Sequence, residues 1–167
     1  MELRSAPGEV LDRVARSGEA FLIERNGQQL ACLVPLSLFM PDIQPARMSR
    51  EVEQLNLQNE VYTSSITDDQ ELEIRVQEKR GDTIFPITIR LPHGYPNSCP
   101  KVFIDHVVEN SPHRWPDGSL CIFGAMELWN PGKHDVLHVL ELTRRWISKY
   151  QEWQKKGVWE TQNEDTD

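Results

Sequence analysis

Long apolar runs and cysteines are both scarce in this sequence of 167 residues. No apolar stretch approaches the roughly 20 residues that a helix needs to span a bilayer, so we expect no membrane segment. The three cysteines, Cys32, Cys99 and Cys121, are an odd number without tight spacing, which argues against a disulfide framework. The first residues, MELRSAPGEV, also lack the pattern of a secretory signal peptide. These absences predict a soluble, cytoplasmic protein.

Positive charge is also in short supply. Lysine and arginine number 18 against 26 aspartates and glutamates, and the formal net charge of −8 argues against broad contact with nucleic-acid phosphates. Hydrophobic residues make up 38 % of the chain and charged residues 26 %, so the chain can form a sizeable core. The length fits one medium domain, or a compact domain with a small appendage. Residues 159–167 carry part of the negative charge, and we expect them to form a disordered acidic tail.

The composition divides the chain into two pieces. Pro41 and Pro45, with Asp42 between them, interrupt both helical and strand patterns, which predicts a linker near residues 40–47. We therefore expect a first piece in residues 1–42 and a second domain over residues 47–158.

The first piece has the pattern of a helix followed by a hairpin. Ser5 can cap a helix that has Pro7 in its first turn, and Gly18 ends its apolar periodicity. The apolar runs EAFLIER and QQLACLVPL then flank Asn26-Gly27, a strong short-range signal for a hairpin. Lone domains shorter than about 40 residues rarely fold without help. We therefore expect this helix–hairpin to pack on the second domain or on a copy of itself.

The second domain reads as α+β, with an antiparallel meander flanked by helices. A first helix over SREVEQLNLQNEVY has Ser49 as its expected N-cap and Glu51 in its first turn. Alternating apolar residues predict strands in ELEIRVQ and TIFPITIRL, and KVFID supplies a third. The proline-rich stretch PHGYPNSCP separates the last two strands. A final helix runs from about Asp135 to Lys156, with one apolar face, and Gly157 closes it.

Cys121 lies in the run SLCIF, directly after a Pro-Asp-Gly turn, and three interpretations are open. From this run alone, a small buried hydrophobic residue is the favoured role. A zinc site could use Cys121 with His113, His134 and His138, but no Cys-x-x-Cys pair is present, so we expect no metal or other cofactor. The third role is a nucleophile, for which the run itself carries no cysteine-protease signature.

Three segments around this cysteine resemble the ubiquitin-conjugating enzyme family. They are FPITIRLPHGYPNSCPKVFI, SPHRWPDGSLCIF and LWNP, and with their flanks they extend the resemblance over residues 47 to about 157. Gly118 to Ile122 match the family's Gly-x-hydrophobic-Cys-hydrophobic active-site segment, while Trp129 and Pro131 match the Trp-x-Pro that follows it. The ending ISKYQEWQKKGVW resembles bacterial members from antiphage and ubiquitin-like conjugation operons. The resemblance therefore implies a ubiquitin-conjugating-enzyme-like fold.

The resemblance also implies a chemistry and a set of partners. Cys121 would be the nucleophile of a thioester carrier that acts with a ubiquitin-activating-type enzyme and a ubiquitin-like modifier or a C-terminally conjugated protein. His113 stands where the family has the asparagine of His-Pro-Asn, which supports the oxyanion, so it is the second candidate catalytic residue, with a plain loop histidine as the alternative. Trp129 is expected to pack beneath the loop that carries Cys121. The alternative function is an inactive binding module with the same fold.

The first piece carries a resemblance of its own. Residues 2–39, with an Arg-Asn-Gly turn followed by Ala-x-Leu-Val-Pro, resemble the Phd/YefM antitoxin family, whose members dimerise through such a unit and bind operator DNA. The first strand of that family is missing here, and a folded domain replaces its toxin-binding tail. The resemblance therefore implies a homodimerisation module, with an antitoxin-like autoregulator and an ordinary helix–hairpin as the alternatives.

Overall fold

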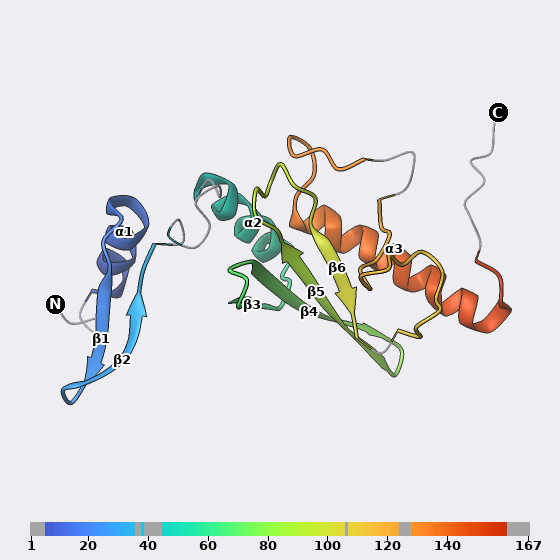
Figure 1. Ribbon diagram of the computed structural model, residues 1–167, viewed down its shortest axis with the longest axis horizontal. Coiled ribbons are helices and arrows are strands. Elements are labelled where there is room, and N and C mark those ends of the chain that lie inside the picture. Colours follow the sequence, from blue (N-terminus) through green and yellow to red (C-terminus); the bar gives the residue numbers. More distant parts are fainter. Residues whose placement is uncertain (1–5, 36–37, 39–44, 106, 124–127, 160–167) are drawn as a thin grey trace. The chain divides into compact units, whose positions relative to one another are not determined.

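The computed structural model describes residues 6–35, 38, 45–105, 107–123 and 128–159 (Figure 1). It divides into two compact units, residues 1–50 and 51–167. The described residues form three helices and two antiparallel sheets, in the expected α+β class. None of these helices is long and apolar enough to cross a membrane.

The N-terminal unit contains the predicted helix and hairpin. Its elements are α1 (Pro7–Ser17), β1 (Phe21–Arg25) and β2 (Gln28–Leu33). The residue at the N-cap position of α1 is Ala6, whereas the predicted cap, Ser5, lies outside the described residues. Pro7 begins the helix because the first turn needs no N–H from it, and Gly18 ends it in the left-handed conformation, with φ of 70°. The apolar periodicity and the turn residues were thus sufficient to predict α1, β1 and β2 from the sequence.

The second unit is built on a four-stranded antiparallel sheet. Its strands, in spatial order, are β3 (Tyr62–Ile66), β4 (Leu72–Arg80), β5 (Thr83–Leu91) and β6 (Lys101–Ile104). The apolar residues predicted for one face of β4 and β5 are buried, whereas Glu73, predicted for the exposed face, is also buried and accepts hydrogen bonds from Arg75 and Arg90. The buried apolar residues are Leu72, Ile74, Val76, Phe85, Ile87, Ile89 and Leu91.

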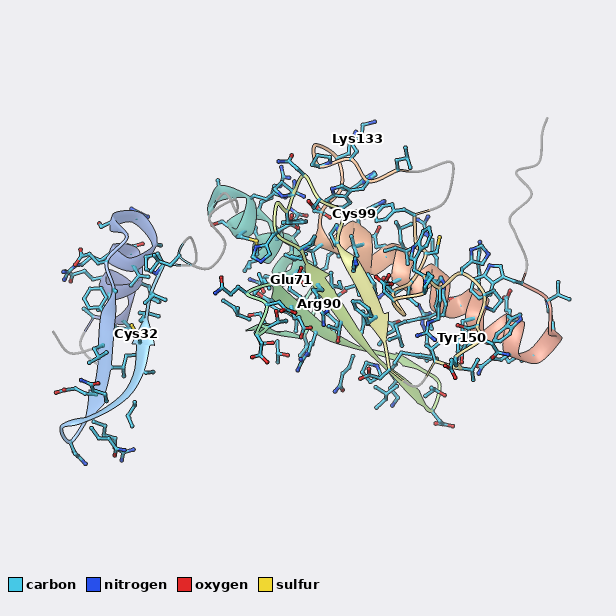
Figure 2. The ribbon with its side chains drawn as sticks, in the orientation of Figure 1. Cys32, Glu71, Arg90, Cys99, Lys133 and Tyr150 are labelled. Atoms are coloured by element: carbon cyan, nitrogen blue, oxygen red, sulfur yellow. The ribbon has the colours of Figure 1, made fainter. Side chains whose placement is uncertain are left out.

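The helix α3 (Val136–Lys156) lies across this sheet and closes the core (Figure 1). It begins at the N-cap residue Asp135, whose side chain accepts a hydrogen bond from the His138 N–H, and it ends at Gly157, as predicted. Tyr150, labelled in Figure 2, packs perpendicular to the Phe85 ring of β5, with 6.5 Å between the ring centroids. The core of this unit therefore lies between α3 and the buried face of the sheet.

The predicted N-cap of the helix after the expected linker was wrong. The helix α2 runs over Pro45–Leu57, so Ser49 lies inside it and is not its N-cap. The last three residues of the expected linker, 45–47, are helical, and residues 40–44 lie outside the described residues. Proline is compatible with the first turn of a helix, where its missing N–H has no partner to lose. The sequence reasoning treated Pro45 as a breaker, whereas it begins the helix.

The strand β3 was missed, and its first residue, Tyr62, was assigned to the preceding helix. The helix ends earlier because Asn59 adopts a left-handed conformation, with φ of 55°. After the half-buried Tyr62, the other four residues of β3 are exposed. A polar edge strand of this kind lacks the alternation of apolar residues by which strands are predicted.

One buried carboxylate joins three parts of the second unit. Glu51, in α2, is 0 % exposed and accepts a hydrogen bond from the Tyr95 hydroxyl. Its other oxygen accepts the N–H of Val136, the first residue of α3, at 2.7 Å. A helix N-terminus leaves such N–H groups without intrahelical partners and favours negative charge beside them. Glu51 therefore fixes α2 and the loop after β5 to the start of α3.

We predict that Glu51→Ala lowers the free energy of unfolding by about 3 kcal/mol, because it leaves the buried Tyr95 hydroxyl and Val136 N–H without this acceptor. Glu51→Gln should lose less, since its amide oxygen can still accept one of these bonds. Urea unfolding measures both variants, and Glu53→Ala, which removes an exposed carboxylate from the same helix, is the matched control. Equal stability of the Glu51→Ala and Glu53→Ala variants would contradict this role.

Candidate active site

The loop that carries Cys121 is a short hairpin held by its own backbone. Trp115 N–H donates to the Ser119 carbonyl at 2.8 Å, and Gly118 N–H donates to the Trp115 carbonyl at 2.9 Å. Pro116 occupies the second position of this turn, where its fixed φ is favourable. Gly118 has φ of 84°, and a Cβ there would approach Arg114 Nη2 to 3.2 Å. The Pro-Asp-Gly sequence therefore sets the shape of the loop, as expected.

Hydrogen bonds and an ion pair attach this loop to the edge of the sheet. Leu120 N–H donates to the Val102 carbonyl of β6 at 2.8 Å. The Asp117 carboxylate lies 2.8 Å from Lys101 Nζ and also accepts the backbone N–H and the hydroxyl of Ser119, at 3.0 and 2.6 Å. These bonds, from Lys101 first and then Ser119, hold the pKa of Asp117 far below its usual range. Asp117 is therefore ionised at any working pH and keeps the loop against β6.

His113 and Cys121 lie opposite each other across the hairpin. Cys121 N–H donates to the His113 carbonyl at 2.8 Å, next to the bridge between Arg114 and Leu120. The same carbonyl accepts the indole N–H of Trp146, on α3, at 3.2 Å. The structure thus brings the two predicted site residues together through the backbone and ties them to α3.

The two side chains have different surroundings. Cys121 is half-buried, and its thiol donates weakly to the Phe123 carbonyl at 3.7 Å. His113 is exposed, has φ of 56°, and packs its ring against Trp159 with 4.9 Å between centroids. A left-handed φ carries a cost for any residue with a Cβ, although histidine adopts it more often than most, so the contacts of this loop hold the His113 backbone in a strained conformation.

Trp129 packs against Phe123, just after Cys121, and its packing beneath the Trp115–Cys121 hairpin stays a prediction. Its indole N–H donates to the Pro96 carbonyl at 2.7 Å. Its ring lies 5.9 Å from the Tyr95 ring and 5.7 Å from the nearly perpendicular Phe123 ring, between centroids. Phe123 therefore packs on a fixed indole two residues beyond the cysteine.

The four residues considered for a zinc site form two pairs. His113 and Cys121 lie across the hairpin from each other, and His134 and His138 lie together at the start of α3. His134 and His138 stack on each other at 4.4 Å between centroids, and the Phe123 ring stacks on His134 at 5.8 Å. The Nδ1 atom of His134 accepts the N–H of Asn130 at 3.0 Å. Within the residues that the structure describes, no group of three or more histidine, cysteine, aspartate or glutamate side chains is arranged to hold a metal ion.

A groove of about 840 Å³ borders the Cys121 loop. Its walls include Ile122, the neighbour of the cysteine, and the exposed side chains of Trp115 and Leu128. Cys99, in the loop after β5, and Trp129 also line the groove. Such an apolar hollow beside a thiol is suited to side chains of a protein partner.

Cys99 is the second thiol near the site, in the loop between β5 and β6 (Figure 2). Although the residue as a whole is exposed, the protein packed around its thiol raises the pKa of Cys99 to about 11. The thiolate is the nucleophilic form of cysteine, so Cys99 stays in its unreactive form at neutral pH. Cys32 lies in the hairpin of the N-terminal unit (Figure 2).

Sequence reasoning missed two contributors to this site. The ion pair of Asp117 with Lys101 joins residues 16 positions apart, which no local pattern reveals. Trp159 was assigned to the acidic tail, yet its ring lies against both His113 and Trp146. The sequence did contain a signal for this contact. A large aromatic residue shortly after Gly157, which ends the helix, indicates packing against the protein, because solvated tails contain few aromatic residues.

The comparison with family models agrees with this geometry. An antiparallel sheet covered by one long helix, with a half-buried thiol in a rigid loop at its edge, is consistent with the fold of E2 proteins, the ubiquitin-conjugating enzymes. Residues 44–166 match the model of the Type II CBASS E2 protein family, and the chain belongs to that family. It is thus an E2-like protein of CBASS antiphage defence. No curated protein matches the chain.

Proposed function

We propose that this protein is a cysteine thioester carrier. The Cys121 thiolate attacks the thioester that joins an activating enzyme to a ubiquitin-like modifier or to the C-terminus of a protein to be conjugated. A new S–acyl bond forms on Cys121, and the thiolate of the activating enzyme leaves. An amine then attacks the acyl carbon, the Cys121 thiolate leaves, and the amine's proton passes to solvent or a base. The product is an amide, so acyl transfer is complete without a cofactor.

The placement of Cys121 carries this proposal. The thiol is half-buried in a loop that is anchored to β6 and to α3, so it meets an incoming acyl group in a fixed position. The raised pKa of Cys99 removes the neighbouring thiol as a competitor at neutral pH. Family membership supports the same conjugation chemistry.

We assign His113 the second role, support of the oxyanion that develops during amine attack. The backbone N–H of Cys121 is already donated to the His113 carbonyl, so a donor for the oxyanion has to come from elsewhere. His113 lies directly across the hairpin from Cys121, and its imidazole can donate a hydrogen bond.

For the N-terminal unit we propose self-association through one face of its hairpin. The Arg13 guanidinium lies 4.9 Å from the centre of the Phe21 ring, so Phe21 is on the face toward α1. Leu22 and its partner Cys32 are therefore on the opposite face, and Leu30 is the extra residue of a β-bulge two positions before Cys32. Both leucines are more than half exposed. A second copy can cover these exposed side chains by two-fold symmetry, and a lone two-stranded sheet needs such cover.

The first test concerns the nucleophile. Incubation with the cognate activating enzyme, its substrate protein and ATP should give an adduct that reductant removes, and Cys121→Ala should abolish it. Cys99→Ala and Cys32→Ala are the matched controls and should keep the adduct at pH 7.5. Non-reducing gels report the outcome. An adduct that persists in Cys121→Ala would assign the thioester elsewhere, and no adduct in the wild type would favour a binding module.

The second test separates the two steps in which His113 could act. His113→Ala should slow discharge of preloaded protein to a small amine by about a hundredfold, since a lost oxyanion donor costs about 3 kcal/mol. Loading should change little. His113→Asn should retain part of the discharge rate, because an amide can donate to the same oxygen. Single-turnover assays measure both steps, and equal discharge by the wild type and His113→Ala would leave His113 as a loop residue.

The third test concerns assembly. Light scattering should give a dimer for the full chain and a monomer for a Leu22→Lys/Leu30→Lys variant, because two charges cannot be buried in the proposed contact. Leu57→Lys, which changes an exposed leucine of the other unit, should stay dimeric. A monomeric wild type, or equal masses for all three proteins, would contradict self-association through this face.

A further inference from the structure

The backbone contacts of His113 do not fix the position of its imidazole ring. Both of the bonds that fix the residue, from Cys121 N–H and from the Trp146 indole, end on its carbonyl oxygen. The side chain is exposed, so solvent alone would allow it several rotamers. A donor must be held in place before the reaction to be effective, because ordering it during the reaction adds to the barrier.

A column of aromatic rings reaches from the core to this imidazole. Tyr150 is 2 % exposed, and Trp146 stacks on it with 5.2 Å between centroids and 12° between planes. Trp159 lies 5.5 Å from Trp146, and the His113 ring lies 4.9 Å from Trp159, tilted by 30°. Trp159, which contacts the imidazole, is thus supported by the rings of Trp146 and Tyr150 in α3.

The end of α3 explains how Trp159 reaches this position. Gly157 adopts φ of 73°, and its N–H donates to the Trp153 carbonyl at 2.7 Å, which stops the helix and turns the chain. Val158 is 64 % exposed, whereas Trp159 is half-buried. The turn therefore directs the tryptophan, rather than the valine before it, against the protein.

We propose that Trp159 is a positioning residue that holds the His113 imidazole beside the Cys121 thioester. This inference rests on the proposed function, since it gives the imidazole a reaction to serve. Trp159 touches neither the thiol nor the acyl group in this account and acts only through His113. The segment after α3 is thereby part of the active site.

The kinetic test uses single-turnover loading and discharge. Trp159→Ala should slow discharge to a small amine by about tenfold and change loading by less than about twofold, because only discharge uses the imidazole. Trp159→Phe should restore most of the rate, since a phenyl ring can still stack. The matched control is Trp153→Ala, which removes another half-buried tryptophan of the same chain end, one that contacts Tyr150 at 5.8 Å.

A double variant separates positioning from general damage to the fold. In a His113→Ala background, Trp159→Ala should cause no further loss of discharge, since the group that it positions is gone. An additive loss in the double variant, an equal loss in Trp153→Ala, or a wild-type rate in Trp159→Ala would each overturn the inference.

An NMR measurement tests the stacking without any activity. The ring protons of His113, assigned by their loss in His113→Asn, should be shifted upfield by the indole and should return toward ordinary values in Trp159→Ala. If the wild type never loads, the proposed function fails whatever the NMR result. If it loads, and the shift disappears in Trp159→Ala without slower discharge, the stacking is real but the positioning role is overturned.

Discussion

The second, E2-like unit depends on the buried carboxylate of Glu51. Removing a carboxylate from water is costly, and here the Tyr95 hydroxyl and the first N–H of α3 supply the compensating hydrogen bonds. Tyr95 in turn contacts Trp129, whose ring lies against Phe123, two residues beyond Cys121. A single acidic side chain in the core therefore sets both the start of the main helix and the aromatic support under the candidate active site.

The second constraint is that the Cys121 loop is attached on two sides. The β6 edge holds it through Leu120 and through the ion pair of Asp117, and α3 holds it through the Trp146 indole. A thioester carrier benefits from this arrangement, since the acyl group arrives already activated and a fixed approach matters more than a strong base. The strained φ of His113 fits the same picture, because the surrounding contacts hold the residue in an unfavourable conformation.

Local patterns in the sequence were enough to predict most of the helices and strands and the turn before Cys121. Alternation predicted β4 and β5, and the turn residues around Gly118 and the Gly157 cap were recognised correctly. The start of α2 was missed because a proline such as Pro45 can either interrupt a helix or begin one, and β3 was missed because the polar run YTSSI lacks the alternation of apolar residues. The stacking of Trp159 on His113 joins residues far apart in the chain, so no spacing rule could have revealed it.

The central claim is that the Cys121 thiol carries an acyl group. Mass spectrometry of the loaded protein, digested at low pH without reductant, tests it most directly by mapping the modified residue. The account predicts that the acyl mass is found on the peptide that contains Cys121 and is lost after treatment with a reducing thiol. An acyl mass on Cys99 or Cys32, or on a lysine in a form that resists reductant, would contradict the account.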